Sequence, residues 1–252
     1  MTKFAVRLKR YLKRNLDALW MRVVFIPHFL KIKTQSSPRF SLRWRDKWPC
    51  YADATATTGF DKHYIYHPAW AARVLSEIKP EKHIDISSTL YFSVNVSAFI
   101  PIEFYDYRPA KIELDGLECK SGNLIDLPFK DGEVESVSCM HVIEHIGLGR
   151  YGDPLDYDGD LKAARELMRV TKEKGCLLIV VPIGGEALIQ FNAHRIYTYD
   201  NIIHMFAEMS LVEFSLIPDK SEQGLIRHAS KEISDMQRYG CGCFHFQKLS
   251  AT

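Results

Sequence analysis

The chain has 252 residues, of which 46% are hydrophobic and 25% charged, and its formal net charge is +2. These values are ordinary for a soluble globular protein of one large domain, or one domain with an appendage. The six cysteines are scattered without a CxxC pair. This spacing argues against a zinc finger or a disulfide framework and favours a reduced, cytoplasmic compartment.

The charge is divided unevenly along the chain. Residues 1–34 hold nine Lys or Arg and one Asp, a balance of +8, whereas the remainder holds 24 basic and 30 acidic residues. The sequence therefore predicts a basic N-terminal arm, residues 1–33, on a mildly acidic body. Because the body is acidic, we do not expect nucleic acid as a partner.

Residues 3–26 carry apolar side chains at steps of three and four, which predicts an amphipathic helix, and Pro27 is expected to end it. The longest stretch without Lys, Arg, Asp or Glu is Val23–Leu30, eight residues, whereas a membrane span needs about 20. Two interpretations stay open. The arm lies on an anionic membrane surface, which would place the protein on the inner face of the membrane, or it docks on the body or on a second subunit.

Residues 34–80 are expected to form a linker followed by a lid-like helical segment. Pro, Ser and Thr punctuate 34–62 without a period, and 69–79 reads as a helix stopped by Pro80. Between them lies the sequence HYIYHP, whose aromatic rings suit stacking on a sugar but are equally compatible with core packing. We expect His63 and His67 to contact substrate there.

From residue 81 to 252, strands and helices alternate, which predicts a doubly wound α/β sheet. The expected strands are 83–87, 101–108, 111–114, 134–140, 176–184, 211–219 and 241–248; the expected helices are 91–100, 159–172 and 199–209. Ligands of such sheets bind beyond the carboxyl ends of the strands. The stretch that follows 134–140 contains His141, Glu144 and His145, so the main site is expected there.

This order of segments resembles the class I S-adenosylmethionine-dependent methyltransferases over residues 82–219. The resemblance implies a Rossmann-like, mostly parallel sheet with an antiparallel edge strand, and S-adenosylmethionine as the cofactor. It also implies that Asp85, Ser87 and Ser88 bind the cofactor from the first loop. Asp106 and Asp126 would contact its ribose and adenine, and Met140 would contact it from the end of the fourth strand. The first loop departs from the family because it contains no glycine, and a tight turn with positive φ is harder without one.

From about residue 39 the chain also resembles a bacterial methyltransferase-like domain family that is associated with surface-polysaccharide genes. The motifs that carry this resemblance are FDKHYIYHPAW, EHIGLGRYGDPLDYDGD and FNAHRIY. It implies a sugar or a lipid-linked glycan as the substrate.

Two interpretations of the polar cluster stay open. If the segment after Met140 is helical, His141, Glu144 and His145 share one face and can hold a divalent metal ion, with His194 as a further ligand. Alternatively, Glu144 and His145 form a hydrogen-bonded edge of the pocket, and His145 or His141 acts as a general base.

The glycine- and aspartate-rich loop 147–160 is expected to cover the mouth of the pocket. Its charged side chains, and two residues of FNAHRIY, are predicted to contact substrate: Arg150, Asp153, Asp160, Arg195 and Tyr197. The alternative is an internal Arg–Asp network with Asp158 or Asp160 as a helix cap.

The most direct function from the sequence is O-methyl transfer from S-adenosylmethionine to a sugar or lipid-linked sugar in surface-glycan assembly. An enzyme of the same fold without this cofactor, which uses the His/Glu/Asp cluster for glycosyl transfer or hydrolysis, is the second hypothesis. A non-catalytic glycan-binding subunit, tethered by the basic helix, is the third.

Overall fold

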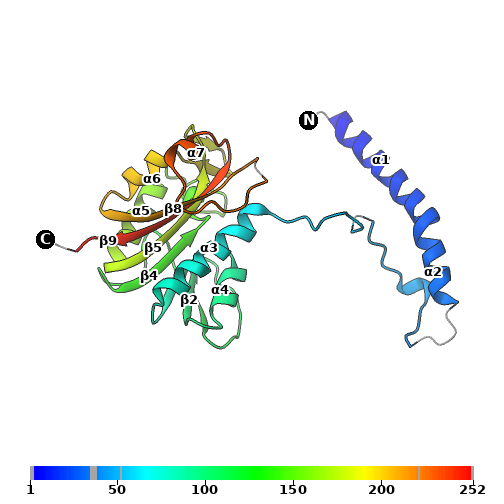
Figure 1. Ribbon diagram of the computed structural model, residues 1–252, viewed down its shortest axis with the longest axis horizontal. Helices are drawn as coiled ribbons and strands as arrows, with labels where there is room; N and C mark the ends of the chain where they lie inside the picture. Colours follow the sequence, from blue (N-terminus) through cyan, green and yellow to red (C-terminus); the bar gives the residue numbers. More distant parts are fainter. Residues whose placement is uncertain (1–2, 35–38, 52, 221, 251–252) are drawn as a thin grey trace. The chain divides into compact units, whose positions relative to one another are not determined.

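A computed structural model of the chain describes residues 3–34, 39–51, 53–220 and 222–250 (Figure 1). The chain divides into two compact units, Met1–Gly59 and Phe60–Thr252. No helix in the described part is long and apolar enough to cross a membrane.

The first unit is mostly helical. Helix α1 (Lys3–Trp20) continues through a π-helical turn, η1 (Met21–Phe25), into α2 (Ile26–Lys33), and a 3₁₀ turn, η2 (Trp44–Asp46), follows. The prediction that Pro27 ends the helix was wrong. Pro27 occupies the first turn of α2, directly after the π turn, where a missing N–H and a fixed φ are tolerated.

The second unit is built on one seven-stranded sheet of order β3-β2-β1-β4-β5-β9-β8. The strands are β1 (His83–Ile86), β2 (Ile102–Asp106), β3 (Leu117–Ser121), β4 (Val134–Met140), β5 (Thr171–Ile183), β8 (Met209–Ile217) and β9 (Gly240–Lys248). Strands β3, β2, β1, β4 and β5 pair in parallel, and β9 pairs antiparallel with both β5 and β8. A small hairpin joins β6 (Leu188–Gln190) to β7 (His194–Ile196).

The predicted doubly wound α/β sheet is confirmed, with two local differences. The reversed strand, β9, is not at the edge but lies between β5 and β8. The third strand begins at Leu117 instead of 111, because Gly116 turns the chain with φ +76° just before it.

Helices cover both faces of this sheet (Figure 1). Helices α5 (Gly159–Val170) and α6 (Tyr199–Met205) pack on one face, and α3 (Lys62–Ile78) and α4 (Leu90–Val96) on the other; α7 (Lys231–Asp235) is short. Along β5, Leu177 and Ile179 belong to the first core and Leu178 and Val180 to the second. This alternation explains why the strand is apolar at every position.

Helix α3 begins at Lys62, seven residues earlier than predicted, with Asp61 as its cap. The Asp61 carboxylate accepts a hydrogen bond from the Tyr64 N–H, and Pro68 is accommodated inside the helix. His63 and His67 therefore lie on the first turns of a helix that packs on the sheet.

A buried polar network joins β1 to β4. The two ring nitrogens of His83 lie 2.8 and 2.9 Å from the hydroxyls of Ser136 and Ser138, and the Ser138 hydroxyl also donates to Asp85 at 2.7 Å. Ser93 of α4 donates to the second oxygen of Asp85. Burial raises the pKa of Asp85 to about 6, although hydrogen bonds from Ser88, Ser93 and Ser138 oppose the effect.

This raised pKa predicts how stability depends on pH. In the unfolded chain Asp85 loses its proton near pH 4, so between pH 4 and 6 the folded state binds more protons and the free energy of unfolding falls as pH rises. The unfolding free energy of the wild type minus that of Asp85→Asn should therefore fall by about 3 kcal/mol between pH 3.5 and 8. Denaturant titrations at several pH values measure it, with the exposed Asp126→Asn as control. A difference that stays constant or rises with pH contradicts the assignment.

Candidate functional site

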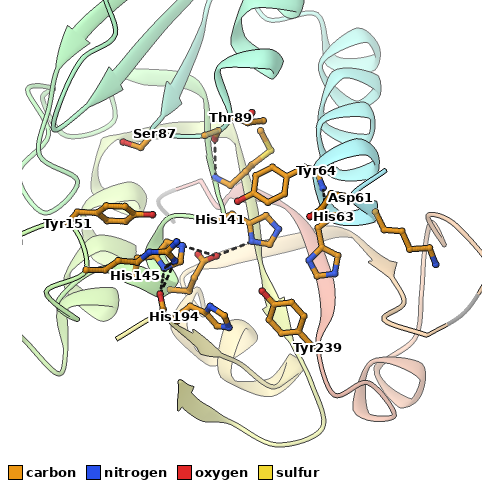
Figure 2. A pocket seen from close by; sticks show the side chains of 16 residues that line it. Asp61, His63, Tyr64, Ser87, Thr89, His141, His145, Tyr151, His194 and Tyr239 are labelled. Carbon is orange, nitrogen blue, oxygen red and sulfur yellow. Dashed lines mark hydrogen bonds and ion pairs between the residues drawn. The ribbon is translucent and has the colours of Figure 1, made fainter. Parts of the chain in front are cut away.

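A cavity of about 750 Å³ lies at the carboxyl ends of β1 and β4 (Figure 2). Its wall combines the turn after β1, the polar stretch after β4, the start of α3 and two later loops. The lining residues are Asp61, Lys62, His63, Tyr64, Ser87, Ser88, Thr89, Met140, His141, Glu144, His145, Arg150, Tyr151, Ala193, His194 and Tyr239. The cavity has the size of a small-molecule site and lies at the predicted edge of the sheet.

The turn after β1 is made without glycine. Ser87 adopts φ +54°, its N–H donates to the Tyr105 carbonyl at 2.8 Å, and its hydroxyl donates to the same oxygen at 3.1 Å. The Ser88 hydroxyl accepts the Met140 N–H at 3.1 Å, which ties the turn to the end of β4. Ser87, Ser88 and Met140 thus line the cavity as predicted, but both hydroxyls already bond within the chain.

The end of β4 is also turned by a residue other than glycine. His141 has φ +58°, and a 3₁₀ turn, η3 (Ile143–His145), follows it. The α-helix after Met140, on which the metal hypothesis depended, is therefore not formed. The turn nevertheless brings the same side chains together, because the His141 Nδ1–H donates to Oε1 of Glu144 at 2.9 Å.

Glu144 is the buried centre of the site, with 1% of its surface exposed. Its Oε1 lies 2.9 Å from His141 Nδ1 and 3.8 Å from His145 Nε2. Its second oxygen, Oε2, is buried without a hydrogen-bond partner among the residues described. A buried carboxylate oxygen of this kind is costly unless a ligand or water meets it.

His145 has a defined tautomer. Its Nδ1 lies 2.7 Å from the Ala193 carbonyl, so Nδ1 carries the proton and Nε2 carries the lone pair. Burial lowers the pKa of His145, and likewise that of His194, whose Nε2 is buried without a partner in the described structure. A neutral imidazole with a free Nε2 can accept a proton near neutral pH.

Aromatic rings form the wall beside α3. His63 stacks on His141, with ring centroids 5.7 Å apart, and Tyr64 stacks on His141 at 5.5 Å. Tyr239 reaches both His63 and His194, at 5.3 and 5.2 Å. Burial, and next the neighbouring His141, lowers the pKa of His63 to about 4.

His67 does not line the cavity. It is fully buried one helical turn behind His63, and its Nδ1–H donates to the His63 carbonyl at 2.6 Å. Its predicted contact with substrate is therefore corrected: the period of α3 turns the side chain toward the core and the edge of the His141 ring.

The glycine-rich loop after η3 is stabilised by hydrogen bonds to one of its own side chains. Asp153 accepts hydrogen bonds from the N–H groups of Gly147, Gly149 and Tyr151. Its predicted role toward substrate is corrected, because a short carboxylate in a glycine-rich loop satisfies the loop's own donors. Arg150, by contrast, lines the cavity and donates to the Ala193 carbonyl at 3.0 Å.

Arg195, Asp160 and Tyr197 form the internal network that was the alternative interpretation. The buried Arg195 donates to the carbonyls of Ile146 and Tyr157 at 2.7 and 2.8 Å and lies 3.4 Å from Asp160. The Tyr197 hydroxyl donates to Asp160 at 2.9 Å. These three residues line a second cavity of about 610 Å³ instead of the first, so their predicted contact with the same substrate is corrected.

Three of the predicted cofactor residues lie outside the first cavity. Asp85 is fully buried beneath the turn, in the network with Ser93 and Ser138. Asp106 ends β2 and accepts the Arg108 N–H at 2.7 Å, and Asp126 is exposed. Asp85 cannot touch a ligand, since its carboxylate is fully enclosed.

The predicted metal set does not gather around one point. The rings of His145 and His194 are 6.2 Å apart, and Glu144 already accepts from His141. Within the described part of the chain, the ligand atoms that lie within 4.8 Å of one another belong to His63, His141 and Cys241.

Sequence reasoning missed Tyr239, Cys241 and Thr89. Tyr239 and Cys241 flank the start of β9, and because β9 runs antiparallel to its neighbours, its beginning lies at the edge where the parallel strands end. A prediction that β9 runs antiparallel would have indicated that Tyr239 and Cys241 lie at the site. Thr89 directly follows the two serines that were selected.

Comparison with protein families and curated proteins gives partial matches. Residues 130–238, less than half of the chain, match the family described as Caenorhabditis protein of unknown function, DUF268. Uncharacterized protein MJ0638 of Methanocaldococcus jannaschii is 35% identical over 78 residues, which are 30% of this chain and 29% of that protein. The match thus spans less than a third of the length of this curated relative.

Solved structures match over most of the second unit. A chain of the complex between the Haloferax volcanii Trm112 methyltransferase activator and the putative methyltransferase has a TM-score of 0.52 at 17% identity, covering 76% of this chain and 92% of that one. The YcgJ protein of Bacillus subtilis has a TM-score of 0.52 at 13% identity, covering 73% and 99%. A Burkholderia thailandensis 1,6-didemethyltoxoflavin-N1-methyltransferase, solved with S-adenosylhomocysteine, has a TM-score of 0.52 at 8% identity, covering 73% and 79%.

These likenesses define the class of fold. Together with the mostly parallel seven-stranded sheet, they show that the chain has the fold of the class I S-adenosylmethionine-dependent methyltransferases. At identities below a fifth, the fold is what the solved structures establish.

Proposed function

We propose that the protein is an enzyme that transfers a methyl group from S-adenosylmethionine to a hydroxyl of a sugar or lipid-linked sugar in surface-glycan assembly. The observation that supports it best is one cavity with two ends. The turn Ser87–Thr89 and Met140 line one end, and Glu144 and His145 line the other. A methyl donor and an acceptor with its base can therefore share one cavity.

The residues present fit S-adenosylmethionine in part. Ser87 makes, at φ +54°, the left-handed turn that glycine usually makes, and the cavity is large enough for a small-molecule cofactor. Ser87, Thr89 and Met140, which line the turn end of the cavity, would hold the methionine part. When bound, the cofactor supplies an electrophilic methyl group.

The chain's own residues would prepare the acceptor hydroxyl. The Ala193 carbonyl fixes the proton of His145 on Nδ1, so Nε2 accepts the hydroxyl proton. Glu144, 3.8 Å from that nitrogen, stabilises the resulting imidazolium by its negative charge. The tyrosine rings that line the cavity, Tyr64, Tyr151 and Tyr239, offer flat apolar surfaces to a sugar, and Arg150 offers donors to its oxygens.

Cofactor binding is the first test. Calorimetry of the full chain should give heat with S-adenosylmethionine and S-adenosylhomocysteine. Thr89→Phe should abolish it by filling the turn end of the cavity, whereas the matched Leu90→Phe, one residue outside the lining, should not. Absence of heat with either ligand at millimolar concentration would count against methyl transfer.

The role of His145 is the second test. His145→Ala should lower transfer of radiolabelled methyl groups into extracted lipid-linked oligosaccharide by about 10²- to 10⁴-fold. Because the pKa of His145 is lowered, the wild-type rate should persist below pH 6.5 and decline only in more acidic buffer. The exposed His204→Ala is the control. An undiminished rate in His145→Ala removes the general-base role.

A second function for this cavity has one specific observation in its favour. The hydroxyls of Ser87 and Ser88 both bond within the chain, and no glycine opens the turn. The same fold without S-adenosylmethionine would then use Glu144 and the imidazoles for glycosyl transfer or hydrolysis, or would bind glycan without catalysis. Heat with a glycan extract, and none with the cofactor, would favour this alternative.

We also propose that the N-terminal arm binds an anionic membrane surface, which would hold the enzyme on its inner face. Leu12, Leu16, Leu19 and Val23, at steps of four, three and four, have 51 to 65% of their surfaces exposed. An exposed apolar stripe on a basic helix suits the boundary between lipid head groups and acyl chains.

Vesicles of phosphatidylserine and phosphatidylcholine test the arm. The full chain should co-sediment with them at low salt and be released by added salt, and Leu16→Glu with Leu19→Glu should prevent binding. Leu155→Glu, also an exposed leucine, is the matched control in the other unit. Equal pelleting of all three proteins would end the proposal.

A further inference from the structure

Three side chains with metal-ligand atoms converge at one side of the cavity. They come from three separate elements: His63 from the first turn of α3, His141 from the turn after β4, and Cys241 from the start of β9. Their ligand atoms all lie within 4.8 Å of one another. Figure 2 shows the His63 and His141 rings beside each other at this wall of the cavity.

The distances around His141 suit a zinc ligand. Its Nε2 lies 3.4 Å from Cys241 Sγ, and around a tetrahedral zinc ion a nitrogen and a sulfur ligand are about 3.5 Å apart. Its other nitrogen, Nδ1, donates to the buried Glu144 carboxylate at 2.9 Å. A carboxylate behind a histidine ligand fixes the tautomer with the lone pair on the metal side.

A second observation comes from a histidine that none of the proposed steps uses. His67 is fully buried, and its Nε2 has no hydrogen-bond partner in the described part of the chain. Its ring meets the His141 ring edge-on, with centroids 5.0 Å apart. An imidazole nitrogen left unsatisfied in the protein interior is costly in a purely structural role.

Burial keeps the imidazoles of His63 and His67 neutral. Burial, and next His141, lowers the pKa of His63 to about 4, and burial lowers that of His67 well below its usual range. Neutral imidazole is the form that binds metal ions. Burial raises the pKa of the Cys241 thiol, so a metal ion that binds there must displace the thiol proton.

We propose that His63, His141 and Cys241 form a zinc-type metal site, with Glu144 as the carboxylate that orients His141. One thiolate and two imidazoles suit Zn²⁺, and three protein ligands leave a fourth position open. That position would be filled by a water or acceptor oxygen in the cavity. The site differs from the set expected from sequence, since Glu144 supports a ligand instead of being one. It does not depend on methyl transfer, because binding is measured without S-adenosylmethionine.

The absorption spectrum of bound Co²⁺ tests the site. The full chain is stripped with a chelator, dialysed and titrated with Co²⁺, and then with Zn²⁺. One equivalent of Co²⁺ should produce a thiolate-to-cobalt charge-transfer absorption in the near ultraviolet, and Zn²⁺ should displace it. No such absorption, or one that needs many equivalents, would overturn the site.

Variants assign the ligands. Cys241→Ser should lose the charge-transfer absorption, whereas Cys243→Ser, the buried cysteine two residues along the same strand face, should retain it. His63→Gln should weaken Co²⁺ binding at least tenfold, and His194→Gln, in the same cavity but outside the cluster, should not. Glu144→Gln should retain the absorption and weaken affinity about 10- to 100-fold.

Circular dichroism and a thermal unfolding curve of each variant show that it is folded. Because His63 is only partly buried, His63→Gln tests the site even if Cys241→Ser fails to fold. Equal affinity in the wild type and His63→Gln, or retained thiolate absorption in Cys241→Ser, rejects this ligand set.

Discussion

The hydrogen bond between His141 and Glu144 is the interaction on which the site depends. A carboxylate with 1% of its surface exposed is unfavourable unless donors meet it, and the described residues give its Oε1 the His141 N–H at 2.9 Å. This bond fixes which nitrogen of His141 carries the proton and directs Nε2 toward Cys241. It also holds the negative charge 3.8 Å from His145 Nε2. One buried charge therefore sets the properties of two imidazoles that face different parts of the cavity.

Backbone strain at two strand ends makes this arrangement possible. Ser87 after β1 and His141 after β4 both adopt left-handed φ values, which cost energy in residues other than glycine. Both line the same cavity, and such conformations persist where the surrounding structure holds them in place. Ser87 is held by the Tyr105 carbonyl, and His141 by Glu144 and the Val180 carbonyl. Two of the five described residues other than glycine that have a left-handed φ therefore lie at this cavity.

The sequence predicted the sheet and the edge of the site because these follow from local patterns. Apolar runs and alternating helices identify β4 and β5, and the polar residues after β4 must then lie at the carboxyl edge. The sequence could not show which groups these polar side chains bond. Asp153 and Arg195 have the residue types of a ligand site, but N–H groups of the loop after η3 satisfy Asp153, and carbonyls of the same loop satisfy Arg195. Nothing in the sequence around Cys241 shows that it lies beside His141; this follows from the antiparallel direction of β9.

The absence of glycine in the turn after β1 affects which end of the cavity can offer hydrogen bonds to a ligand. A glycine turn leaves the backbone N–H groups open to a ligand, whereas here the Ser87 N–H is taken by Tyr105 and the Ser88 hydroxyl by Met140. Among the described side chains that line the cavity, the buried polar atoms without a partner lie at the other end, on Glu144 and His194. Binding energy in this cavity should therefore come more from the imidazole and carboxylate end than from the turn. A protein of this fold that recognises its ligand from that end would depend on its acceptor, or on a metal ion beside it, more than on the cofactor turn.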